Sequence, residues 1–145
     1  MTRLNPHIHF NGNAEEAFEF YRSIFGGSFS RLIRYKDLTT LADHFSSNEL
    51  EKIFHISLTI GSDSVLMGSD VPSYLGKVSE NEHRSKVVVG APSQAHADKI
   101  FLELSKGGSV ECPIGLSPWN SYFGALRDQY GVEWIIEFIF TNEQF

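Results

Sequence analysis

The chain repeats one order of segments twice, and this repeat constrains its fold more than any other feature of the sequence. In the first copy, residues 7–11 alternate polar and apolar side chains, which is typical of a half-buried strand. Asn13 and Glu16 then predict the capped start of a helix, and Gly26 and Gly27 predict its end, because glycine accepts the left-handed conformation. The apolar face of this helix is formed by Ala14, Ala17, Phe18, Tyr21, Ile24 and Phe25.

The second copy follows the same order. Residues 87–89 predict a strand, Ser93 predicts a helix N-cap, and Gly107 and Gly108 predict the helix end. The apolar face of this second helix is formed by Ala97, Ile100, Phe101 and Leu104. Three extended segments follow each helix: residues 29–35, 53–60 and 65–68 in the first copy, and residues 109–112, 121–127 and 132–140 in the second.

This order predicts an α+β fold of two tandem β-α-β-β-β modules within one domain, residues 1–145. The first module spans residues 5–70 and the second spans residues 84–141, with residues 71–83 as the linker. Each module is expected to be a mixed, largely antiparallel four-stranded sheet backed by one helix.

Composition limits the classes of function. Twelve Lys and Arg against eighteen Asp and Glu give a net charge of −6, which disfavours a nucleic-acid or anionic-membrane partner. The apolar runs are strand-sized and the amino terminus lacks a signal-peptide core, so no membrane span is expected. Cys112 is the single cysteine, which excludes an internal disulfide and indicates a cytoplasmic setting. Aromatic residues reach 13%, which fits either a large core or a ligand cleft.

Two segments depart from the repeat. Residues 36–52 contain no convincing strand, and a loop of this length predicts either a lid over a site or disorder. Residues 112–124 crowd two prolines and three aromatic residues into a short loop, which predicts cover for either a core edge or a pocket mouth.

Several short motifs lie in a fixed order along the two copies. They are Pro6-His7-Ile8-His9-Phe10-Asn11-Gly12, Phe54-His55-Ile56-Ser57-Leu58, Leu66-Met67-Gly68-Ser69-Asp70, Trp119-Asn120-Ser121-Tyr122-Phe123-Gly124 and Asp128-Gln129-Tyr130-Gly131. With the repeat, they resemble the PhnB-like branch of the vicinal oxygen chelate superfamily, which includes glyoxalase I, bleomycin-resistance proteins and extradiol dioxygenases. The resemblance implies the glyoxalase/bleomycin-resistance/dioxygenase fold, a small-molecule ligand in a cleft of strands, and a homodimer.

Proteins of this branch often carry the label 3-demethylubiquinone-9 3-methyltransferase. A nucleotide methyl donor normally binds a glycine-rich turn that opens a helix in a parallel, doubly wound sheet. The double glycines of this chain end helices instead, so the sequence does not favour methyl transfer.

In metal-dependent members of the superfamily, polar strand faces hold a divalent ion in the cleft. Alternation places His7 and His9 on the polar side of the first strand, His55 on that of residues 53–60, and Glu137 opposite the apolar side of the last strand. The resemblance therefore implies His9, His55 and Glu137 as ligands of Zn²⁺, Fe²⁺, Mn²⁺ or Ni²⁺.

The metal-free alternative stays open. Residues 65–68 and 85–90, from which metal-dependent relatives supply further ligands, carry none here. The expected substrate-binding residues are His7, Trp119, Tyr122 and Phe123, whereas His44, His83 and His96 are expected to be solvated.

Three functions follow from this interpretation. The first is a metal-dependent lyase, isomerase, transferase or dioxygenase-type enzyme, whose catalytic residues the sequence does not identify. The alternative is a non-catalytic, resistance-type protein that binds a small molecule without metal. The third is a dimeric module with a vestigial cleft.

Overall fold

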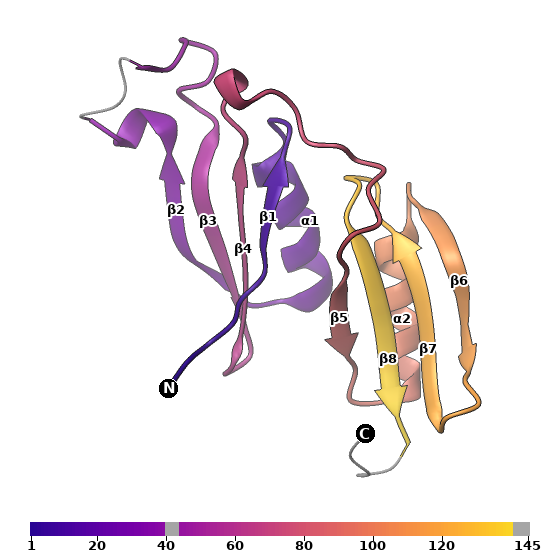
Figure 1. The fold of residues 1–145 in the computed structure, drawn as a ribbon. Coiled ribbons are helices and arrows are strands. Elements are labelled where there is room, and N and C mark those ends of the chain that lie inside the picture. The colour runs from indigo at the N-terminus through magenta and orange to yellow at the C-terminus, as the bar shows by residue number, and fades with distance from the viewer. Residues whose placement is uncertain (40–43, 141–145) are drawn as a thin grey trace. The chain divides into compact units, whose positions relative to one another are not determined.

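The computed structural model describes residues 1–39 and 44–140. The chain divides into two units, Met1–Val78 and Ser79–Phe145, which we describe separately (Figure 1). In each unit one helix covers one face of a four-stranded mixed sheet. This confirms the predicted α+β fold of two tandem modules. Residues 40–43 of the expected lid, and Thr141 at the end of the expected second module, lie outside the described residues.

The first unit follows the order β-α-β-β-β. Its strand order is β1-β4-β3-β2, in which β1 runs parallel to β4 and the other pairs are antiparallel. Short 3₁₀ turns follow β2 and β4. The elements are β1 (His7–Phe10), α1 (Ala14–Phe25), β2 (Ser28–Arg34), η1 (Tyr35–Asp37), β3 (Ile53–Ile60), β4 (Ser64–Asp70) and η3 (Ser73–Leu75).

The second unit repeats this topology, with strand order β5-β8-β7-β6 and β5 parallel to β8. The prediction of a loop from residue 112 was wrong, because β6 continues to Leu116 through register shifts at Cys112 and Gly115. An edge strand tolerates Pro113, since one side of its backbone needs no partner. The elements are β5 (Val87–Gly90), α2 (Gln94–Ser105), β6 (Ser109–Leu116), β7 (Ser121–Arg127) and β8 (Glu133–Ile139).

Each helix packs its predicted apolar face onto its sheet. Phe18 of α1 is fully buried and lies so close to β4 that a Cβ on Gly68 would come within 2.6 Å of its ring. Ile56 and Leu58 of β3 are also fully buried under this helix, as their alternation predicted. In the second unit the buried side chains between α2 and the sheet include Ala97, Ile100, Phe101, Leu104, Leu126, Trp134 and Ile136.

The start of α1 differs from its prediction. Asn13 holds the N-cap position, but its side chain makes no capping hydrogen bond. Asp70, at the end of β4, instead accepts hydrogen bonds from the backbone N–H groups of Gly12 and Ala14, at 3.0 and 2.9 Å. The free N–H groups of a helix start are thus satisfied by a residue far along the chain. The cap of α2 is as predicted, since Ser93 Oγ accepts from the His96 N–H at 3.1 Å.

No helix within the described residues is long and apolar enough to cross a lipid bilayer.

Candidate functional site

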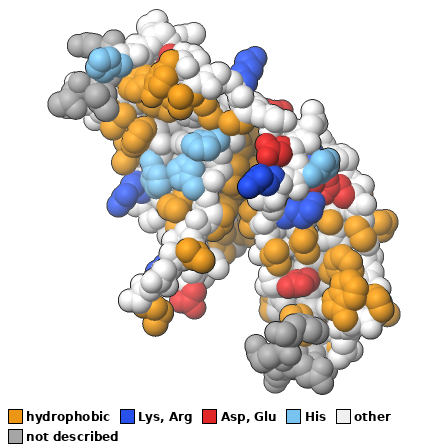
Figure 2. Space-filling model, in the orientation of Figure 1, with side chains coloured by type: hydrophobic (Ala, Val, Ile, Leu, Met, Phe, Trp, Pro, Cys, Tyr) orange, Lys and Arg blue, Asp and Glu red, His pale blue; other side chains and the backbone are white. Residues whose placement is uncertain are grey.

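Three histidines share the face of the first sheet that α1 does not cover. The pairing of β1 with β4 sets His7 beside Met67 and His9 beside Ser69, and β3 pairs Ser57 with Met67. Paired residues project to the same side of a sheet, so these side chains lie on one face. We call it the open face and define it by His7, His9, His55, Ser57, Met67 and Ser69. Figure 2 shows histidine side chains gathered over this part of the first unit.

Short distances join these side chains. Ser69 Oγ lies 3.0 Å from His7 Nε2 and 3.0 Å from His9 Nδ1. The ring of His7 lies between the other two, with centroids 5.2 Å from His9 and 5.6 Å from His55. His55 Nε2 is 2.8 Å from Ser57 Oγ. The structure therefore brings together His7, His9 and His55, all of which the sequence nominated.

The electrostatics of the open face favour the neutral forms of His7 and His55 beside one permanent positive charge. Burial, followed by the neighbouring rings of His9 and His55, lowers the pKa of His7. Burial, followed by the charge of Arg31 on β2, lowers the pKa of His55. The four strands, all of them within the described residues, contain one acidic residue, Asp70, which is buried under the opposite face. Arg31 pairs with Ser57 across β2 and β3, so its side chain projects to the same side of the sheet. The open face thus combines its guanidinium with imidazole and hydroxyl groups.

The structure brings only two of the three predicted metal ligands, His9 and His55, together on one face. Among the described residues, the His, Cys, Asp and Glu side chains whose ligand atoms all gather within 4.8 Å are His83, Glu111 and Glu133, and not the histidines of the open face. A first-row ion needs its ligand atoms about 2.0–2.2 Å from one centre. Glu137 lies on β8 in the second unit, so the set of His9, His55 and Glu137 stays a prediction.

The group around His83 is already neutralised by cations of the protein. Lys86 Nζ lies 2.8 Å from Glu133 and 3.2 Å from Glu111, Arg127 lies 3.4 Å from Glu133, and His83 Nδ1 lies 2.9 Å from Glu133. Burial raises the pKa of Glu133, but hydrogen bonds with Glu111, Lys86 and His83 outweigh it and lower that pKa to about 2. The ammonium of Lys86 bridges the two carboxylates where a cation would sit, so the donor set fits an ion-pair network better than a metal.

Sequence reasoning missed this network. His83, which was expected to be solvated, keeps an exposed side chain but contacts the buried Glu133. Its members come from the linker, the residue before β5, and the strands β6, β7 and β8, and no local spacing indicates that they meet.

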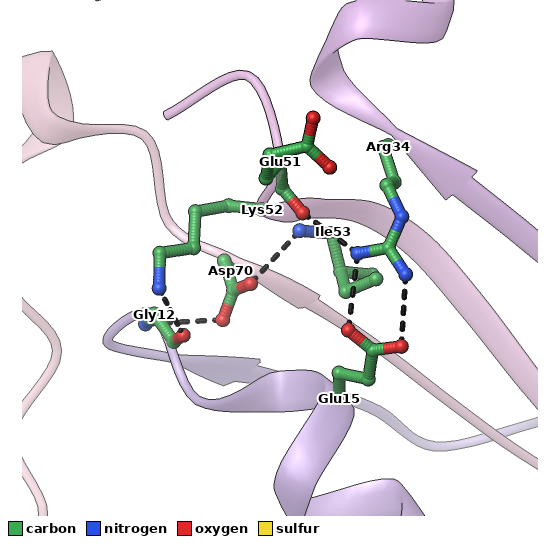
Figure 3. Close-up of a pocket in the computed structure, with 7 residues that line it drawn as sticks. All are labelled: Gly12, Glu15, Arg34, Glu51, Lys52, Ile53 and Asp70. Atoms are coloured by element: carbon green, nitrogen blue, oxygen red, sulfur yellow. Dashed lines mark hydrogen bonds and ion pairs between the residues drawn. The ribbon is translucent and has the colours of Figure 1, made fainter. Parts of the chain in front are cut away.

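A recess of about 350 Å³ lies beside the start of α1 (Figure 3). The charged side chains that line it are already paired. Arg34 forms a bidentate ion pair with Glu15 at 2.8 and 3.0 Å, and Lys52 Nζ donates to the carbonyl of Gly12 at 2.9 Å. Asp70 accepts from the backbone of Ile53, also at 2.9 Å. These pairs hold the segments around the recess in place, which indicates a structural role.

The three aromatic residues expected to bind substrate, Trp119, Tyr122 and Phe123, lie in the second unit. Phe123 pairs with Glu137 across β7 and β8, and the rings of Phe123 and Trp119 lie 5.4 Å apart. Tyr122, the next residue along β7, projects to the other side and donates a hydrogen bond to Asp98 of α2. The structure thus groups Trp119, Phe123 and Glu137 and leaves Tyr122 on the helix-covered face.

Comparison with known proteins agrees with this architecture. Escherichia coli (strain K12) protein YjdN is 23% identical over 143 residues, covering 94% of this chain and 95% of that protein. The crystal structure of protein PA1353 from Pseudomonas aeruginosa is 29% identical, with a TM-score of 0.81 and coverage of 96% of this chain and 98% of that one. The PhnB protein from Bacillus cereus is 25% identical, with a TM-score of 0.76 and coverage of 94% and 99%.

A more distant structure shares the fold alone. The glyoxylase/bleomycin resistance protein/dioxygenase domain from Frankia sp. EAN1pec is 10% identical, with a TM-score of 0.65 and coverage of 95% of this chain and 97% of that one. A family model described as 3-demethylubiquinone-9 3-methyltransferase matches residues 2–137. That description does not assign methyl transfer to this chain, whose mixed sheets differ from the parallel, doubly wound sheet that normally binds a nucleotide methyl donor. The chain belongs to this 3-demethylubiquinone-9 3-methyltransferase-like (PhnB) family, and it has the glyoxalase/bleomycin-resistance fold.

Proposed function

We propose that the protein binds a small organic molecule with an oxyanion group, such as a carboxylate or phosphate, on the open face of the first sheet. The observation that carries this proposal is the charge of Arg31 beside His55, on a face with three imidazoles and two serine hydroxyls. The one carboxylate of the four strands, that of Asp70, is buried on the other side. An anion on this face therefore meets no opposing charge from these strands.

The residue types suit an oxyanion. A guanidinium donates up to two parallel hydrogen bonds to a carboxylate or phosphate. Neutral imidazoles and hydroxyls add donors, and they adapt because each also accepts. Met67 on the same face offers apolar contact to the rest of the ligand.

The test uses benzoate and inorganic phosphate as probes, titrated into the full chain by isothermal calorimetry at low ionic strength. We expect saturable binding of at least one probe, weakened about 10-fold in Arg31→Gln, because a charge-assisted hydrogen bond contributes about 1.5 kcal/mol. Arg22→Gln is the matched control: it removes the same charge from α1, where Arg22 pairs with Glu19. Unchanged affinity in Arg31→Gln, or no saturable binding of either probe, would contradict the proposal.

Metal-dependent catalysis is the second candidate, and it is favoured because two of the three predicted ligands, His9 and His55, lie on this face. Protein purified without a histidine tag or chelator would then contain about one metal ion per chain, and a His9→Gln/His55→Gln variant would lose it. His96→Gln, which removes an exposed imidazole at the start of α2, is the control. Equal metal content in all three proteins would exclude a site at these histidines.

A further inference from the structure

Ser69 joins two imidazoles of the open face through one hydroxyl group. Its Oγ is 3.0 Å from His7 Nε2 and 3.0 Å from His9 Nδ1. Because Ser69 pairs with His9 between parallel strands and is only 6% exposed, its side chain is held between the two rings. The other titratable or charged groups near this bridge are His55 on β3 and Arg31 on β2.

The proton count of this bridge restricts the tautomers of both rings. A serine hydroxyl has one proton to donate, and a neutral imidazole has one N–H and one lone pair. If Ser69 donates to His7 Nε2 and accepts from His9 Nδ1, both rings carry their proton on Nδ1. If it donates to His9 Nδ1 and accepts from His7 Nε2, both rings carry it on Nε2.

The mixed states are less stable. In one, two lone pairs face a single hydroxyl proton, so one hydrogen bond is lost. In the other, both rings donate to Oγ, and the hydroxyl proton of this buried serine finds no third partner among the described residues. A buried donor without an acceptor costs about 1–3 kcal/mol. The two rings are therefore expected to have the same tautomer when both are neutral.

We propose that Ser69 couples His7 and His9, so that the two rings change tautomer together and act as one proton carrier. Starting with both protons on Nδ1, a proton binds at His9 Nε2. The His9 Nδ1 proton passes to Ser69 Oγ, the hydroxyl proton passes to His7 Nε2, and the Nδ1 proton of His7 leaves. One proton enters and one leaves, so the charge of the pair is unchanged and both rings end with their proton on Nε2.

This coupling suits a reaction in which a bound molecule loses a proton at one atom and regains one at another. His7 and His9 would exchange protons with the molecule, and Ser69 is a positioning residue that acts through them. Use of the carrier in a reaction rests on the proposed binding on this face, but the coupling itself needs no ligand.

The test is nitrogen-15 NMR of the imidazoles in the ligand-free full chain, at about pH 8.5, above the ordinary imidazole pKa. Nitrogen shifts distinguish a protonated from an unprotonated ring nitrogen, so they report each tautomer. We expect equal Nδ1–H fractions for His7 and His9 at every temperature measured. Unequal fractions or opposite tautomers in the wild-type protein would overturn the coupling.

Two variants sharpen this result. In Ser69→Ala, the bridge is lost, and we expect the resonances of both inner nitrogens, His7 Nε2 and His9 Nδ1, to shift, whereas Ser69→Thr keeps the hydroxyl and restores them. Ser57→Ala is the matched control, because it removes a serine that bonds His55 alone, at 2.8 Å. If Ser69→Ala moves the nitrogen of one ring only, Ser69 does not couple the pair. Failure of the anion titrations would leave these spectra unchanged, so the two proposals fail separately.

Discussion

Asp70 connects most segments of the first unit through hydrogen bonds. It is 2% exposed, and its carboxylate accepts backbone hydrogen bonds from Gly12, Ala14 and Ile53. The hydroxyl of Tyr35 also donates to its backbone carbonyl at 2.6 Å. The ends of β1, α1, β3 and β4 thus meet at one side chain.

Replacing this carboxylate with an amide should destabilise the protein. In Asp70→Asn one of the two oxygens becomes an NH₂ group, which faces a backbone donor instead of accepting from it. We expect a loss of about 2–4 kcal/mol in the free energy of unfolding, because a buried donor loses a charged acceptor. Urea unfolding measures this loss. Asp63→Asn, in the exposed turn before β4, is the control and should change little. Equal stability of the two variants would contradict this role of Asp70.

At the scale of elements, the helices and strands followed from apolar periodicity and double glycines, and the structure confirms them. The features that could not be predicted depend on partners distant in sequence. Asp70 replaces Asn13 as the cap of α1 across 56 residues, and β6 runs past Pro113 because it is an edge strand. Local patterns show which face of an element is apolar, but not which distant group satisfies its polar atoms.

The packing of α1 on its sheet depends on Gly68, because glycine has no Cβ at this close contact. A Cβ on Gly68 would lie 2.6 Å from Phe18 Cε1 and 3.0 Å from the carbonyl of Ile8. Since Phe18 is fully buried, Gly68→Ala should cost about 1–3 kcal/mol of unfolding free energy. Gly90→Ala in β5 is the matched control, because its Cβ meets nothing within 4 Å. Thermal unfolding with equal midpoints for the two variants would refute this packing.

Glu49 connects the segment before β3 to η3 through hydrogen bonds. Its carboxylate accepts from the backbone N–H of Ser73 and from the hydroxyls of Ser46 and Ser73, and these bonds lower its pKa to about 2 from an ordinary 4.5. A depressed folded-state pKa stabilises the protein above the unfolded value, and that contribution is lost as the pH falls from about 4.5 to about 2.

The pH dependence of Glu49→Gln tests this connection. We expect the variant to be less stable than the wild-type protein at pH 7, and the difference to shrink as the pH approaches 2. Denaturant unfolding at several pH values measures both. Glu19→Gln, which breaks an exposed surface pair with Arg22, should have little effect at any of them. A constant deficit for Glu49→Gln across this range would contradict the role assigned to the carboxylate.

At the scale of the whole molecule, we predict a homodimer. Large apolar side chains stay exposed in the chain, among them Val88 at 55%, Leu116 at 76% and Trp119 at 54%. Burying such a surface against a second copy is favourable. Light scattering at micromolar concentration should therefore give a mass of about twice 16.3 kDa. A mass of one chain at every concentration would exclude the dimer.

In the candidate site, too, the residues set by local strand alternation could be predicted, whereas those set by pairing between distant strands could not. Strand alternation predicted that His7, His9 and His55 lie on polar strand faces, and the structure places them together on one face. Alternation could not nominate Ser69, because its place between His7 and His9 depends on the register of β1 against β4, about 60 residues apart. Glu137 lies on β8 of the second unit, so its place beside these histidines stays a prediction.

Chemical-shift mapping measures directly whether ligands bind on the open face. Benzoate or phosphate is titrated into the isotope-labelled full chain while the backbone amide and imidazole resonances are followed. Binding there predicts that the largest shifts in the first unit fall on His7, His9, His55 and their bonded neighbours Ser57 and Ser69. It is contradicted if these resonances stay fixed while the largest shifts surround the recess at Gly12 and Lys52.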